Sequence, residues 1–332
     1  MSSKGQLLWT VNRLLRPFDL HMGRYSDIWG PTAAQLASWP LPGTSSSSNE
    51  TPFLKVFQGS GVDLRDSFDF AVVMPVTLRP TINRALRSIF SQQFDGRVQV
   101  LIGVDVPLGS RDGLEEICRE VPERQCVFCL YPGYSTSRRH GGPHADGCGG
   151  ALRTVLSYLA NSRFVAYLDD DNWWSPDHLA SMREALSGAD WAYSLRWFVH
   201  PHSGRPICKD EWVSVGPGRG EFRHSGGWVD PNCLAINKQV CEAVLRWWSI
   251  PMRISQTMTD SDCNVFRMLM HEFKGRATGR HSVFYTLNEK DRHQARMQWI
   301  GADRYAAAGR PTVEPEPKGA RLEPSASRDA DG

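Results

Sequence analysis

Between residues 70 and 187 the sequence alternates short apolar runs with stretches of helical periodicity. The runs FAVVMPV, VQVLIGVD, CVFCLY and FVAYL have the length of buried strands. Amphipathic stretches separate them, and in PTINRALRSIFSQQF the residues Ile82, Leu86 and Ile89 fall on one helical face. This alternation predicts an α/β chain with a mostly parallel central sheet flanked by helices.

Two further stretches are predicted as helices around the last of these strands. GGALRTVLSYLANS places Leu152, Val155, Leu156 and Leu159 on one helical face. After the strand, Ser175 is expected to cap a helix whose first residue is a proline.

Composition divides the chain into three parts. Residues 1–60 form an N-terminal extension, expected to be partly flexible around the Ser-rich stretch 41–51. Residues 61–300 form the predicted globular domain, and residues 301–332 are rich in Pro, Gly and charge, which predicts a disordered tail.

Charge and cysteine content narrow the class of protein. A net charge of +2 argues against a nucleic-acid partner, because the basic residues are nearly balanced by acidic ones. The eight cysteines are expected to be reduced thiols in the cytoplasm. A zinc site at Cys126 and Cys129, followed by His140, His144 and Cys148, is the alternative. CVFCLY, however, has the pattern of a strand, which would point the thiols of Cys126 and Cys129 to opposite faces.

The N-terminal stretch MSSKGQLLWTVNRLLRPF is mildly basic and apolar. It lacks the continuous apolar region of a secretory signal, and the sequence has no apolar run long enough to span a membrane. A short amphipathic helix there would allow contact with a partner or with the inner face of the membrane.

Three aspartates, Asp169, Asp170 and Asp171, follow the fourth strand directly. Parallel α/β sheets bind ligands beyond the carboxyl ends of their strands, so these acids are predicted to lie at a binding edge. The first strand ends at Thr77 and the second at Asp105, on the same edge. Carboxylates suit Mn²⁺ or Mg²⁺, which would relieve their repulsion and bring a diphosphate ligand with it. Acids that merely cap the next helix are the alternative.

A second acidic cluster, Thr259-Asp260-Ser261-Asp262, precedes another predicted helix. One of these carboxylates could act as a general base for an acceptor hydroxyl, or the cluster could be an N-terminal cap.

The stretches AVVMPVTLRPTINRALRSIFSQQ, VQVLIGVD, FVAYLDDDNWWSPDHL and TDSDCNVFRML resemble family 2 glycosyltransferases of the GT-A fold. The resemblance covers residues 68–290 and implies a Rossmann-like sandwich. It also implies transfer of a sugar from a nucleotide diphosphate donor, such as a UDP-sugar, to an acceptor hydroxyl, usually with inversion and with Mn²⁺ or Mg²⁺.

The resemblance assigns roles residue by residue. Asp260 or Asp262 would be the catalytic base, and Asp171 and His281 would contact the metal. The residues implied to bind the donor are Pro75, Thr77, Arg79, Asp105, Arg153, Asp169 and Asp170. With a sugar substrate, Trp173, Trp174 or Trp228 could line the acceptor site or pack in the core, and Asp230 could contact the donor sugar or cap a turn.

Departures from the family pattern limit these assignments. Thr259 stands where many relatives have a glutamate, which leaves the choice between Asp260 and Asp262 open. The processive synthases of this family carry a QxxRW motif and membrane helices, and their absence here favours a single addition to a glycan or other hydroxyl acceptor. A nucleotidyltransferase of related fold and an inactive, transferase-like binding protein are the alternatives.

Overall fold

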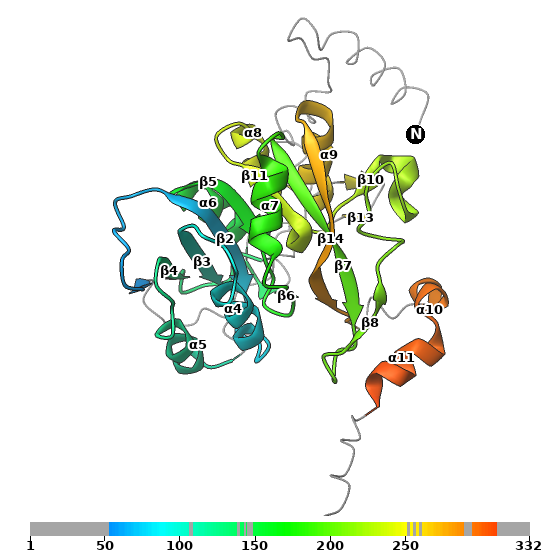
Figure 1. The fold of residues 1–332 in the computed structure, drawn as a ribbon, viewed down its shortest axis with the longest axis horizontal. Helices are drawn as coiled ribbons and strands as arrows, with labels where there is room; N and C mark the ends of the chain where they lie inside the picture. The colour runs from blue at the N-terminus through cyan, green and yellow to red at the C-terminus, as the bar shows by residue number, and fades with distance from the viewer. Residues whose placement is uncertain are drawn as a thin grey trace, which may run out of the picture.

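The computed structural model describes residues 53–105, 109–137, 140–142, 144, 149–250, 253–254, 257–258, 261–288 and 294–310. Its main feature is a ten-stranded sheet in the order β1-β4-β3-β2-β5-β11-β7-β14-β6, with β8 paired to β7 (Figure 1). The strands of this sheet are β1 (Phe53–Gln58), β2 (Phe68–Val76), β3 (Val98–Val104), β4 (Gln125–Tyr131), β5 (Ser162–Tyr167), β6 (Trp173–Trp174), β7 (Trp191–Val199), β8 (Pro206–Lys209), β11 (Leu234–Asn237) and β14 (Gly275–Thr286).

Helices and short elements complete the described part of the chain. The α-helices are α4 (Ile82–Phe90), α5 (Arg111–Cys118), α6 (Gly150–Leu159), α7 (His178–Leu186), α8 (Glu242–Leu245), α9 (Asp262–Glu272), α10 (Gln294–Ile300) and α11 (Ala302–Gly309). Two small hairpins, β9 (Gly216–Pro217) with β10 (Gly227–Trp228) and β12 (Arg253–Ile254) with β13 (Thr257–Met258), lie outside the large sheet. The 3₁₀ helices are η3 (Glu221–Ser225), η4 (Pro231–Cys233) and η5 (Arg246–Ser249).

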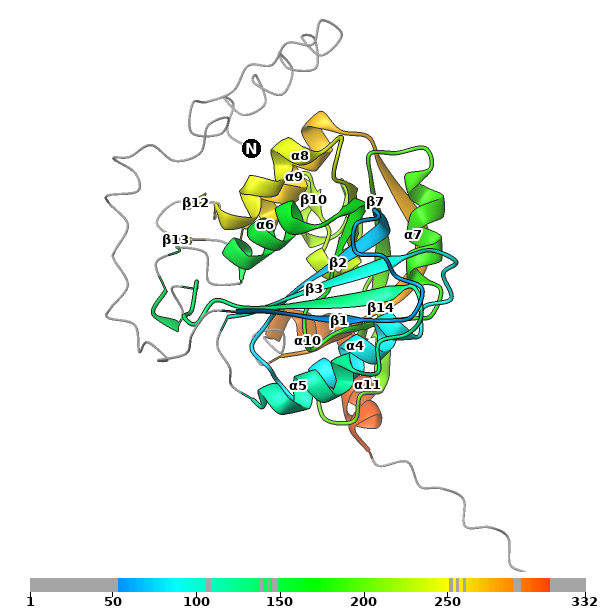
Figure 2. The ribbon, with the colours of Figure 1, turned by 90° about the vertical axis from the view of Figure 1, so that its left-hand side faces the viewer.

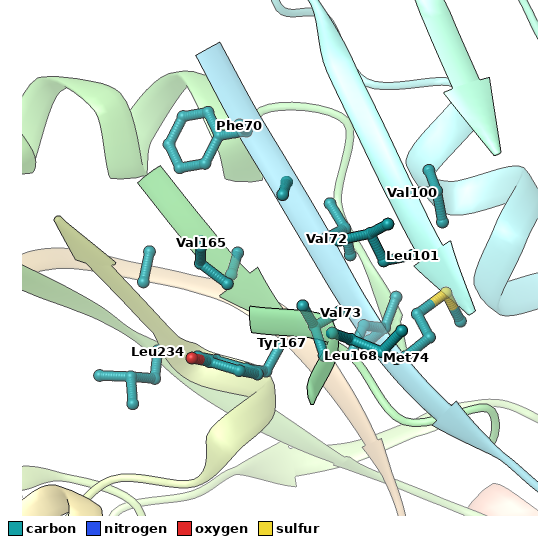
Figure 3. Close-up of a cluster of buried hydrophobic side chains, with 14 of the residues drawn as sticks. Phe70, Val72, Val73, Met74, Val100, Leu101, Val165, Tyr167, Leu168 and Leu234 are labelled. Atoms are coloured by element: carbon teal, nitrogen blue, oxygen red, sulfur yellow. The ribbon is translucent and has the colours of Figure 1, made fainter. Parts of the chain in front are cut away.

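The core of the sheet is parallel, as the alternation of the sequence predicted. Strands β4, β3, β2 and β5 run in the same direction, and Val72 on β2 pairs with Val100 on one side and Ala166 on the other. Strands β3, β2 and β5 are apolar on both faces because both of their faces are covered (Figure 3). The sheet becomes antiparallel at β1, β11 and β6. This confirms the α/β prediction and adds the antiparallel strands to it.

Helices cover the two faces of the parallel strands separately. Helix α6 lies on one side, and α4 and α5 lie on the other (Figure 2). Gly103 on β3 allows α6 to approach closely, because a Cβ atom at this position would lie 3.0 Å from Leu156 and 3.1 Å from Leu152.

The Cys126–Cys129 pair is divided by the sheet, as the strand pattern predicted. Cys129 lies against Cys118 of α5, with 3.9 Å between the two sulfur atoms. Cys126 instead packs with Val62 and Phe68 in a separate apolar cluster. The two thiols therefore do not share a zinc site.

Three features depart from the sequence predictions. Strand β1 lies inside the stretch assigned to the N-terminal extension, and α11 lies inside the stretch assigned to the tail. Helix α7 begins at His178, so the prediction that Ser175 caps it is wrong. The Ser175 hydroxyl instead donates to the Asp177 carboxylate at 2.5 Å.

No described helix is both long and apolar enough to cross a membrane.

His178 anchors α7 to the strands behind the aspartate triplet. Its ring stacks on Trp174 with 4.2 Å between centroids, and Nδ1 lies 2.8 Å from the Ser282 hydroxyl of β14. The side chain is fully buried. Burial lowers the pKa of His178 from 6.5 to about 3, because a charged imidazole would lose its hydration.

We expect His178 to make the fold acid-sensitive. The folded protein keeps His178 neutral while the unfolded chain protonates it near pH 6.5, so its stabilising effect is complete above that pH and declines as the pH falls toward 3. The loss approaches about 1.4 kcal/mol per pH unit. Urea unfolding at several pH values should show a smaller decline for His178→Phe than for wild type. His224→Phe, at an exposed position, is the control and should keep the wild-type slope. Equal slopes for His178→Phe and wild type would contradict the prediction.

Candidate active site

Three strand ends meet at one edge of the sheet, as predicted. The Asp105 N–H, after β3, donates to the carbonyl oxygen of Val76 at the end of β2, at 2.9 Å. Thr77, the residue after Val76, donates its N–H to Oδ2 of Asp170 at 3.1 Å. These bonds join the ends of β3 and β2 to the loop that follows β5.

Asp170 is the buried member of the triplet. Its side chain is 1% exposed, and Arg79 binds it through Nε, 2.8 Å from Oδ1, and through Nη2. Leu78, between Thr77 and Arg79, has φ 59°, a left-handed conformation that is unfavourable for a leucine. Since its flanking residues both bind Asp170, the turn at Leu78 serves to bring them there. Asp170 therefore supports the loop and is not placed to contact a donor.

Asp169 and Asp171 remain accessible at the same edge. Their side chains are 28% and 21% exposed. Nη1 of Arg79 lies 2.6 Å from Oδ2 of Asp171, and the Thr286 hydroxyl donates to the Asp171 carbonyl oxygen at 2.5 Å. Burial raises the pKa of Asp171 to about 7; Arg79 opposes the shift and the two neighbouring aspartates add to it. Asp171 is therefore a carboxylate that gains from an added cation.

Asp169 is held by residues from two other elements. Arg153 of α6 forms an ion pair with it through Nη2. Asn232 of η4 donates from Nδ2 to Oδ2 of Asp169 at 2.9 Å and accepts the Asp169 N–H at 2.7 Å. The sequence indicated Arg153 but missed Asn232. Its only signal was its position two residues after Asp230, in the GGWVDPN stretch.

Asp230 belongs to a buried ion network rather than to the exposed edge. Its Oδ1 accepts the Asn232 N–H at 2.9 Å and Nδ2 at 2.6 Å, so it caps η4. Its Oδ2 accepts from Arg196 at 2.5 Å, and Arg196 also donates to Asp210 at 2.8 Å. Arg196 is 1% exposed and stacks on Tyr285 at 3.9 Å. Of the two interpretations of Asp230, the cap is the one observed.

Asp105 lies at the far end of the edge and is bound by the segment after β4. Its Oδ1 accepts from the Thr136 N–H at 2.6 Å and from the Thr136 hydroxyl at 2.8 Å, while Ser135 donates to Oδ2 at 3.0 Å. Pro75 lies beside the start of α6, where a Cβ atom on Gly149 would approach its ring at 2.8 Å. Pro75 is thus beside the helix that carries Arg153, and Asp105 follows β3, the strand next to β2.

The tryptophans after the triplet are packed. Trp174 is buried, and its Nε1 donates to the Asn232 carbonyl oxygen at 3.0 Å. Trp173 stacks on Phe284 with 5.1 Å between centroids, and the Arg84 guanidinium lies 3.5 Å from its ring. The packing interpretation therefore holds for both residues.

The remaining predicted site residues are not brought to this edge by any contact in the described part of the chain. His281 lies on β14 opposite Leu195, with its ring 6.0 Å from that of Trp197. Thr286, which contacts Asp171, is five residues further along β14, so His281 lies about 16 Å away along the strand. The structure therefore does not bring the two predicted metal contacts together. Asp262 is the first residue of α9 and accepts the Cys263 N–H at 2.6 Å, whereas Asp260 lies outside the described residues.

The edge fits a cation that is bound mainly by its ligand. Within the described residues no group of three or more His, Cys, Asp or Glu side chains could enclose a metal ion. Mg²⁺ is commonly held by only one or two carboxylates, with water and phosphate oxygens as its other ligands. The accessible carboxylate of Asp171 satisfies this requirement.

Comparison with known proteins assigns this edge to a family. The model named Glycosyl transferase family 2 matches residues 71–191. The chain contains a glycosyl transferase family 2 domain. The matched residues include Asp105, Arg153 and the aspartate triplet, whereas Asn232, Asp260 and His281 lie beyond them.

Individual proteins resemble parts of this chain. The succinoglycan biosynthesis protein ExoW of Rhizobium meliloti (strain 1021) is 33% identical over 110 residues, which cover 33% of this chain and 30% of ExoW. The crystal structure of S. aureus TarS 1-349 has a TM-score of 0.46 and 14% identity, over 70% of this chain and 64% of TarS 1-349. The mannosyltransferase PcManGT from Pyrobaculum calidifontis, in complex with GDP-Man and Mn²⁺, has a TM-score of 0.44 and 13% identity, over 88% and 72%.

We expect Asn232 to be required for the stability of this edge of the sheet. Asn232→Leu leaves the Asp169 N–H without its acceptor and removes one of the two donors to the Asp169 carboxylate, which costs about 1–3 kcal/mol. Asn232→Asp at pH 7 should cost more, because it adds a carboxylate between Asp169 and Asp230, and part of that loss should be recovered at pH 5 relative to wild type. Urea unfolding measures both variants. Asn83→Asp, on the exposed face of α4, should change stability by no more than about 0.5 kcal/mol. A similar, small effect at both positions would contradict the assigned role.

Proposed function

We propose that this chain transfers a sugar from a nucleotide diphosphate donor, a UDP-sugar, to an acceptor hydroxyl, with inversion and one addition per acceptor. The observation that carries the proposal is that the three aspartates of the triplet differ in burial and in partners. Asp170 is buried and bound by Arg79, while Asp169 and Asp171 stay accessible on either side of it. A chain that used these acids only as a helix cap would need no such arrangement, and α7 has no side-chain cap among them.

The donor would lie along the carboxyl edge of the sheet. We assign the nucleoside to the side with Pro75 and Asp105, where the carboxylate of Asp105 is fixed by Ser135 and Thr136. The diphosphate would follow toward the triplet, where Arg79 and Arg153 supply positive charge. Guanidinium groups suit phosphate oxygens because they donate in a planar fork. Asp169 would contact the ribose or the sugar, with its orientation set by Arg153 and Asn232.

Asp171 would hold the divalent cation, Mn²⁺ or Mg²⁺. When bound, such a cation neutralises the charge that develops on the diphosphate leaving group. Arg79 would then be shared between Asp170 and the diphosphate. The proposal of His281 as a second contact has no support from its position on β14, and we leave it out of the site.

Asp260 is our assignment for the general base, and Asp262 is the alternative. The acceptor hydroxyl loses its proton as it attacks the anomeric carbon, so the base must reach within hydrogen-bonding distance of that oxygen. Asp262 starts α9 and already accepts the Cys263 N–H, which favours its neighbour for the catalytic role. The name of ExoW supports a glycan acceptor in polysaccharide assembly.

Donor binding should depend on Asp171. Calorimetry with UDP and Mn²⁺ should show binding to wild type, and Asp171→Asn should weaken it by more than the roughly 10- to 100-fold that loss of an outer-shell partner costs. Asp177→Asn is the control, because Asp177 pairs with Arg280 beside α7 and should leave binding unchanged. If no nucleoside diphosphate binds to the wild-type protein in the presence of Mn²⁺, the transferase proposal fails.

The base is tested by separating binding from transfer. We expect Asp260→Asn to retain UDP binding and to lose about 10²- to 10⁴-fold in turnover, because it removes only the proton acceptor. Release of UDP from the donor in the presence of acceptor measures this. Asp262→Asn should keep most of its turnover, and the reverse result would exchange the two assignments.

A further inference from the structure

Helix α6 covers only part of its face of the sheet. Gly103 of β3 faces α6, since its Cβ direction points at Leu152 and Leu156. Directly paired residues of neighbouring strands point to the same face, so Leu130 of β4, which pairs with Gly103, also faces this side. Leu54 of β1 pairs with Leu130 and points the same way. The α6 side of the sheet therefore continues over β4 and β1.

This continuation is apolar and open. Leu54 is 48% exposed and Val56, which pairs with Phe128, is 38% exposed. The opposite face of the same strands is covered by α5, through the ion pair of Lys55 with Glu115 and the contact of Cys129 with Cys118. A sheet of this class normally carries helices on both faces. No described helix covers the α6 side of β1 and β4. Val62 and Leu64 pack there with Cys126 and Phe128, whereas Leu54 and Val56 stay exposed.

Helix α6 borders the open area with two more apolar side chains. The sequence predicted Leu152, Val155, Leu156 and Leu159 as one buried face, but Val155 and Leu159 are 53% and 42% exposed. At about 100° per residue, both lie on the flank of α6 next to Leu152 and Leu156. The opposite flank carries Thr154, whose hydroxyl donates to the Leu245 carbonyl oxygen at 3.4 Å. The exposed flank is therefore the one toward β4 and β1.

We call this area the β1–α6 face and define it by Leu54, Val56, Phe128, Leu130, Val155 and Leu159. It contains four of the seven large apolar side chains that are exposed in the described part of the chain. Contiguous exposed apolar surface of this kind marks a site that another element covers.

The chain before β1 has the right pattern to cover this face. Residues 1–52 lead directly into Phe53, the first residue of β1. Within them, Leu7, Val11 and Leu14 recur at helical spacing, and Leu8 and Leu15 extend the same stripe. Arg13 falls on the opposite side of such a helix, which ends before Pro17. We propose that residues 6–16 form an amphipathic helix that docks on the β1–α6 face and completes the helical layer there.

The connection to β1 is long enough for this return. Between Arg16 and Phe53 there are 37 steps along the chain, which include the Ser-rich stretch 41–51. A flexible connection of this length spans about 30 Å on average. Tethering also gives the segment a local concentration on the order of millimolar, which favours the face of its own chain over another molecule.

A double-mutant cycle in the full chain tests the docking. Leu14→Asp and Val155→Asp each place a charge in the proposed contact, and each should lower Tm by about 3–6 °C. The double variant should show no larger shift than the greater of the two single variants. Arg13→Asp, on the opposite side of the segment, and Val240→Asp, at an equally exposed valine outside the face, are matched controls and should shift Tm by less than about 1 °C.

Three results would overturn the proposal. The first is an unchanged Tm for Leu14→Asp, or additive shifts in the double variant. The second is flotation of the full chain with anionic phospholipid vesicles that Leu14→Asp abolishes without a change in Tm, which would assign the segment to a membrane. The third is a dimer that Val155→Asp dissociates, which would assign the face to a second copy. Binding of UDP with Mn²⁺ should be unchanged in all four single variants, so this test is independent of the proposed activity.

Discussion

Three adjacent carboxylates at the end of β5 repel one another, and the architecture of the active-site edge depends on how this repulsion is offset. Arg79, from the turn after β2, binds Asp170 and Asp171. Arg153, from α6, binds Asp169 together with Asn232 of η4. The offsetting groups come from separate elements, so the loop holds its shape only when β2, α6 and η4 are all in place. Two arginines against three aspartates leave room for a further cation, which is the basis of the proposed donor site.

A second network extends this dependence into the other half of the chain. Asn232 links Asp169 to Asp230, and Arg196 links Asp230 to Asp210. Removing one partner from a buried ion network of this kind typically costs 3–5 kcal/mol, because a charge is left without compensation. The position of Asp169 is therefore fixed partly by residues beyond the region that the family model matches. A substitution near Asp210 should alter the position of Asp169 through this network.

Much of the fold could be predicted because its signals are local. The apolar runs of β2, β3, β4 and β5 and the helical spacing of α4 are properties of short segments, and each was confirmed. Strand β1 was missed because FLKVFQ is short, carries a lysine and follows a Ser-rich stretch. The start of α7 was misplaced because Ser175 and Pro176 form a good capping pattern, yet the Ser175 hydroxyl bonds Asp177 instead. The family resemblance placed His281 beside Asp171 as a metal contact. In the structure it is Thr286, five residues after His281 on β14, that contacts Asp171.

The α/β class and the edge at which Asp105 and the aspartate triplet gather could be read from the chain, because periodicity predicts strands and helices and parallel strands end on one side. Which aspartate is buried, and which two remain accessible, depends on contacts formed in the folded protein. The partners that decide this are distant along the chain: Arg79 lies 91 residues from Asp170, and Asn232 lies 63 residues from Asp169. A local sequence pattern cannot include partners that lie so far apart along the chain. The roles of the three aspartates therefore become distinct only when the chain has folded.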